Sequence, residues 1–112
     1  MSVHFKETFT GFETSSPFRG LQQCIWEGKG FFLVGIGKDK DEAKGMVRDG
    51  FELHRPDIKK AIRAGSMVVD VGLPPTLMHL APFAHAALSE LIGGATVHTT
   101  RTPAGTPSGT MH

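Results

Sequence analysis

The chain has 112 residues, of which 39% are hydrophobic and 21% are charged, and this composition excludes a disordered or a fibrous protein. The length fits one domain. Twelve Lys and Arg against eleven Asp and Glu give a formal charge of +1, so nucleic acid is an unlikely partner for the whole chain.

The cysteine content and the apolar segments of the chain indicate in which cellular compartment the protein resides. Cys24 is the single cysteine, so the chain cannot form an internal disulfide. The N-terminus MSVHFKETFT lacks the basic-then-apolar layout of a secretory signal, and no apolar stretch approaches the length that crosses a bilayer. We therefore expect a cytoplasmic protein that is not secreted by a signal peptide and does not contact membranes.

The first twenty residues are rich in phenylalanine. Val3, Phe5 and Phe9 stand at odd positions, with Glu7 interrupting the alternation, which predicts an edge strand or an extended arm. Residues 11–20 predict a loop that contains Phe12 and Phe18. Exposed aromatic rings are costly unless the core or a neighbour covers them. Phe5, Phe9, Phe12 and Phe18 are therefore candidate contacts with a protein partner.

A β-hairpin is predicted over residues 21–36. Apolar β-forming residues flank Glu27-Gly28-Lys29-Gly30, where glycine supplies the positive φ that a tight turn needs. Residues 31–34 are apolar without alternation, which predicts a strand that is covered on both faces.

Two alternatives stay open for residues 39–53. Asp39 or Asp41 can cap a helix, which Gly45 and Gly50 would keep short, since each costs about 1 kcal/mol relative to Ala. Alternatively, residues 48–50 form a hairpin turn between two short strands.

The remaining elements follow from local signals. Pro56 favours the start of a helix and Gly65 its end, and a β-branched strand follows at residues 67–71. Residues 76–92 predict a helix that is broken at Pro82, and residues 96–101 a final strand. Residues 103–112 are rich in Thr, Pro and Gly and predict a flexible tail.

No recognised motif for catalysis or cofactor binding is present. Gly35 and Gly37 resemble the start of a dinucleotide-binding loop, but Lys40 stands where its third glycine would be. The segment also lacks the Gly-Lys-Ser/Thr ending of a phosphate-binding loop. The six histidines lack the spacing of zinc ligands, and no Gly-x-Ser-x-Gly motif occurs. We expect no cofactor, no metal and no catalytic residue, although an active site without a sequence signature stays open because such sites are assembled in space.

The clearest charged group lies on the helix predicted after Pro56. Arg55, Lys59 and Arg63 share one helical face, and Lys60 is adjacent to them. These residues either form a solvated face or bind an anionic partner, either nucleic acid or an acidic protein.

One family resemblance is carried by three segments. Residues 44–71 (KGMVRDGFELHRPDIKKAIRAGSMVVDV), residues 6–10 (KETFT) and Trp26-Glu27-Gly28 are similar to parts of the lambda-type phage head decoration proteins. The resemblance implies a turn and strand around residues 48–50 before a short helix and a closing strand. It also implies a trimeric, capsid-stabilising protein whose N-terminal arm adds to the shell.

The sequence therefore predicts an α+β fold: a single small domain of β-hairpins in an antiparallel sheet with two or three short helices and extended termini. Residues 1–20 would form an N-terminal arm and loop, residues 21–102 the globular domain and residues 103–112 the tail. The predicted function is a non-enzymatic structural or assembly subunit of a larger complex, formed with a protein partner or with itself as a homo-oligomer or lattice. The alternatives are a binding module that uses helix 55–63 and a small enzyme. The family resemblance implies a virion as the alternative location to the cytoplasm.

Overall fold

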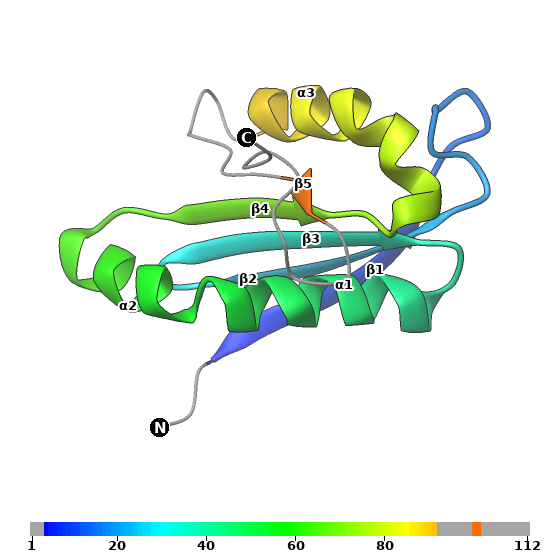
Figure 1. Cartoon of the computed structure of the whole chain (residues 1–112). Coiled ribbons are helices and arrows are strands. Elements are labelled where there is room, and N and C mark those ends of the chain that lie inside the picture. Colours follow the sequence, from blue (N-terminus) through cyan, green and yellow to red (C-terminus); the bar gives the residue numbers. More distant parts are fainter. Residues whose placement is uncertain (1–3, 92–99, 102–112) are drawn as a thin grey trace.

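Five strands form one mixed sheet in the order β1-β2-β3-β4-β5 (Figure 1). The computed structural model describes residues 4–91 and 100–101 of the chain. The strands are β1 (Phe5–Gly11), β2 (Gln22–Gly28), β3 (Phe31–Gly37), β4 (Val68–Gly72) and β5 (Thr100–Arg101). The helices are α1 (Lys40–Leu53), α2 (Arg55–Ala64), the 3₁₀ helix η1 (Pro75–Leu80) and α3 (Ala81–Leu91). The predicted α+β class is confirmed.

The hairpin predicted over residues 21–36 is confirmed. β2 and β3 pair antiparallel, and Lys29 and Gly30 form the turn between Gly28 and Phe31. Gly30 has a φ of 84°, a value that a residue with a side chain rarely adopts. Every residue of β3 except Phe32 is buried, because helices cover both faces of this central strand (Figure 1).

Residues 5–11 form an edge strand of this sheet. β1 pairs antiparallel with β2 along its whole length, from Phe5 opposite Gly28 to Gly11 opposite Gln22. Of the two predicted alternatives, the edge strand is therefore correct and the detached arm is not. The globular domain includes β1, so the predicted boundary at residue 21 lies too late in the chain.

Residues 40–53 form the helix α1 rather than a hairpin. Asp39 caps it, since its carboxylate accepts a hydrogen bond of 2.9 Å from the backbone N–H of Glu42. The helix continues through Gly45 and Gly50 and is longer than predicted, because its buried residues hold it against the sheet. The turn and strand that the family resemblance implies around Gly50 are therefore absent.

β4 pairs with β3 in parallel, so the segment between these two strands does not form a hairpin. Parallel strands need a long crossover, and α1 and α2 supply it. α2 begins with Pro56 in its first turn and ends at Gly65, which has a φ of 73°, as predicted. The prediction of an antiparallel sheet is corrected to a mixed one, since turn signals alone cannot reveal such a crossover.

The second helical region covers the other face of the sheet (Figure 1). η1 and α3 meet immediately before Pro82, so the predicted break is confirmed, and Pro82 lies in the first turn of α3 where a missing N–H is tolerated. β5 contains only Thr100 and Arg101 of the strand predicted at 96–101. The rest of that prediction and the predicted tail at 103–112 lie outside the described residues.

Two apolar cores lie on opposite faces of the sheet. The first lies between the sheet and α1 and α2, and its buried residues include Trp26, Phe31 and Val47. The second lies between the sheet and η1 and α3, with Val69 and Leu73 at its centre. Because the two cores lie on opposite faces of the sheet, N-terminal phenylalanines that pack in different cores cannot share one surface.

Candidate functional site

The outer edge of β1 is one of the two edges of the sheet. β1 is the first strand in the order and pairs only with β2 among the residues that the structure describes (Figure 1). A strand at the edge presents unpaired N–H and C=O groups, which favour pairing with another chain.

The register determines which residues of β1 present these groups. Gly28 and Phe31 flank a two-residue turn, so they form a hydrogen-bonded pair. Alternation along β2 then directs the backbone groups of every second residue toward β1. It follows that Lys6, Thr8 and Thr10 bond to β2, whereas the odd-numbered residues of β1 present their N–H and C=O groups outward.

Glu7 anchors this edge strand to the rest of the domain. Its Oε2 accepts a hydrogen bond of 2.7 Å from the indole N–H of Trp26 and lies 3.7 Å from Nζ of Lys44. The Sγ of Cys24 lies 3.9 Å from the same oxygen. Hydrogen bonds to a charged acceptor are stronger than neutral ones, so Glu7 fixes β1 against β2 and α1.

Cys24 is an unreactive thiol in this setting. It is fully buried, and burial, together with the nearby negative charge of Glu7, raises the pKa of Cys24 to about 11. The thiolate is the nucleophilic form of cysteine. Cys24 therefore contributes to the first core as a small apolar side chain.

The four phenylalanines predicted as partner contacts do not form one surface. Phe5 stacks on Trp26 with 4.4 Å between ring centroids and is 40% exposed. Phe9 packs against the same core. Phe12 and Phe18 lie 5.0 Å apart in the other core, where Phe18 is 6% exposed. Phe18 therefore serves this domain's own packing, and Phe5 is the most accessible of the four.

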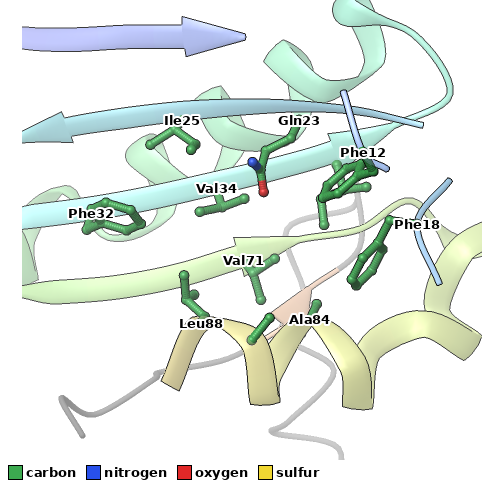
Figure 2. A pocket seen from close by; sticks show the side chains of 11 residues that line it. Phe12, Phe18, Gln23, Ile25, Phe32, Val34, Val71, Ala84 and Leu88 are labelled. Carbon is green, nitrogen blue, oxygen red and sulfur yellow. The ribbon is translucent and has the colours of Figure 1, made fainter. Parts of the chain in front are cut away.

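A hollow of about 90 Å³ lies between the sheet and α3, as Figure 2 shows. Its wall is apolar except for Gln23, whose Nε2 donates a hydrogen bond of 3.0 Å to Oγ1 of Thr10. The hollow exists because α3 faces the sheet with the small residues Ala84 and Ala87. No titratable side chain of the described residues lines it, so this part of its wall can accept an apolar group but provides no acid or base. Its lining residues are Phe12, Phe18, Gln23, Ile25, Phe32, Val34, Ile36, Val71, Ala84, Ala87 and Leu88.

The predicted basic face of α2 is exposed to solvent. Arg55, Lys59, Lys60 and Arg63 are all exposed. Arg55 is engaged within the chain, because it lies 2.7 Å from a carboxylate oxygen of Glu52 and 5.3 Å from the ring centroid of Phe51. The other three form no ion pair within the part of the chain that the structure describes.

A buried histidine and aspartate form a pair that the sequence did not predict. Nε2 of His54, at the junction of α1 and α2, lies 3.7 Å from Oδ2 of Asp70, which is fully buried in β4. Nδ1 of His54 lies 3.9 Å from the exposed Asp57. A single acid within the apolar strand at 68–72 was the signal that could have indicated this pair, because buried carboxylates are paired.

The described ranges, 4–91 and 100–101, contain no group of three or more His, Cys, Asp or Glu side chains that could hold a metal ion. None of the helices there has the length and apolar character needed to cross a membrane.

No family model, curated protein or solved structure matches this chain. Function must therefore be argued from the surfaces of this molecule.

Proposed function

We propose that this chain is a non-enzymatic assembly subunit that associates with a second copy of itself through the free edge of β1. The observation that carries the proposal is that seven residues of β1 pair along one edge only, among the described residues. Association would extend the sheet across a two-fold axis, which is the commonest symmetry of homo-oligomers.

One antiparallel register suits this edge best. With Thr8 on the two-fold axis, all seven residues of β1 are paired. Lys6 then lies opposite Thr10 of the second copy and Glu7 opposite Phe9. Registers centred on Lys6 or Glu7 would instead place like charges directly opposite each other, which destabilises strand pairing.

The side chains at this edge are compatible with that register. Phe5, which is 40% exposed, would lie opposite Gly11 of the second copy, where no side chain opposes its ring. Lys6 lies near one end of the strand, away from the two-fold axis. A charged residue in an edge strand usually opposes aggregation, and here it would disfavour the other registers.

The test places a charge on the two-fold axis. In Thr8→Lys, the two lysines would face each other at the closest pair, so we expect a dimer of the wild type to become a monomer in native mass spectrometry and light scattering. Thr8→Glu should behave in the same way. An equimolar mixture of the two variants should form a heterodimer, because opposite charges then meet across the axis.

Thr14→Lys is the matched control, since it adds the same charge to an exposed loop residue and should leave the dimer intact. Circular dichroism establishes that each variant is folded. A wild type that stays monomeric at high protein concentration contradicts the proposal, and so does a mixture of Thr8→Lys and Thr8→Glu that forms no heterodimer.

A capsid-stabilising role remains a separate prediction of the family resemblance. It calls for a trimer and for binding to a capsid lattice, whereas pairing of two β1 edges calls for a dimer. The mass of the native assembly therefore distinguishes the two. An enzymatic function gains no support from the apolar, non-titratable lining of the hollow next to α3.

A further inference from the structure

The C-terminal half of α2 presents a surface in which cations surround exposed apolar side chains. Ile58 and Ala61 face the core, so Lys59, Lys60 and Arg63 face solvent. Asp57 is the only acidic residue of this helix. α2 therefore concentrates positive charge in a protein whose total charge is only +1.

Two large apolar side chains are exposed at the same end of the domain. Ile62 is 37% exposed and Met67 is 45% exposed. The turn between β2 and β3 lies beside Ile62, because a Cβ added at Gly30 would be 2.6 Å from Cγ1 of Ile62. The residue after Met67 bonds to the same turn, since the N–H of Val68 donates a 2.9 Å hydrogen bond to the carbonyl of Gly30. Lys29, also exposed, is next to Gly30 in this turn.

We infer that Lys59, Ile62, Arg63 and Met67 form a docking surface for an acidic protein segment that carries apolar side chains. Charge complementarity selects an acidic partner, since no carboxylate of the described residues pairs with Lys59 or Arg63. The apolar side chains select a protein rather than a phosphate backbone, because Ile62 and Met67 gain by burial only against apolar groups. This surface is distinct from the outer edge of β1.

The experiment uses three fluorescent probes with the full chain. The first is a helical peptide rich in Glu with Leu and Phe on one face, the second has Ser in place of Leu and Phe, and the third is a short DNA duplex of equal charge. We expect the first peptide to bind, with amide shifts in NMR spectra centred on residues 59–67. The second peptide and the duplex should bind at least about ten-fold more weakly.

Variants then distinguish binding at this surface from non-specific attraction between opposite charges. Lys59→Glu with Arg63→Glu should weaken binding of the first peptide at least about ten-fold, and Ile62→Ser with Met67→Ser should remove its advantage over the second peptide. The matched control is Lys38→Glu with Arg48→Glu, which changes the net charge equally at exposed residues outside α2 and should have little effect.

Three results would overturn the inference. One is the absence of binding by the first peptide. Another is an equal loss of binding in the α2 variant and in the control variant. The third is preferential binding of the duplex with the same residue dependence, which would assign the surface to nucleic acid instead.

Discussion

The contact between α1 and β3 depends on the absence of a side chain at Gly35. A Cβ added there would collide with the carbonyl oxygen of Ala43, lie 2.6 Å from the backbone nitrogen of Val47 and lie 3.0 Å from Cβ of Met46. Two of these atoms belong to the helix backbone, so a change of rotamer cannot relieve the collision. Gly35→Ala must therefore displace α1 from the sheet.

The expected cost of Gly35→Ala is large for a domain of this size. Overpacking a core typically costs about 1–3 kcal/mol, and a displaced helix adds the partial loss of its own packing. We therefore expect the free energy of unfolding to fall by about 3 kcal/mol or more, out of a total that is typically about 5–15 kcal/mol. Unfolding in urea, followed by circular dichroism, measures the loss.

Gly45→Ala is the matched control within the same helix. Gly45 lies inside α1, and a Cβ there would have no heavy atom within 4 Å outside its own helix and chain neighbours. Alanine favours helix by about 1 kcal/mol over glycine, so this variant should be more stable than the wild type by up to that amount. A Gly35→Ala protein as stable as the wild type, or a destabilised Gly45→Ala protein, would refute the argument that close approach requires Gly35.

Two further predictions concern buried polar groups. His54→Ala should lower the free energy of unfolding by about 3 kcal/mol because it takes a partner from the buried carboxylate of Asp70, and a double-mutant cycle with Asp70→Ala should give a coupling of about 0.5–3 kcal/mol; strictly additive losses would contradict the pairing. Cys24 should resist a thiol reagent at pH 8 until the protein unfolds, and rapid labelling of the native state would contradict its burial. Because its pKa of about 11 in the folded protein exceeds the ordinary 9.0, its contribution to stability should be complete below pH 9 and lost as the pH rises through about 11, which urea unfolding across that range measures.

Local sequence signals predicted the hairpin turn and the ends of α2, whereas for α1 they left two caps, Asp39 and Asp41, and a hairpin open. Gly30 closes the hairpin, and Pro56 and Gly65 bound α2. Each acts through its own backbone conformation or hydrogen bond, so no distant part of the chain is needed to recognise it. The basic face of α2 was predictable for the same reason, since helical periodicity alone orients its side chains.

The candidate association edge was only half predictable. Alternation of Phe5 and Phe9 with polar residues indicated an edge strand or an arm, but the choice between them depended on pairing with β2. The burial of Phe18 was not predictable, because the ring of this loop residue enters the core only when η1 and α3 pack over the sheet. The pair of His54 and Asp70 also joins residues from different elements, and only the packed structure brings them together.

The sequence by itself determined the ends of α2, the tight turn, the solvent-facing cations and the α+β class. Only the tertiary structure decided that β4 runs parallel to β3, that α1 continues through Gly45 and Gly50, and that β1 lies at the sheet's edge. The physical reason is that the first set depends on interactions between residues a few positions apart. The second set depends on apolar burial between distant segments, which outweighs local helix propensity and leaves no short-range signal.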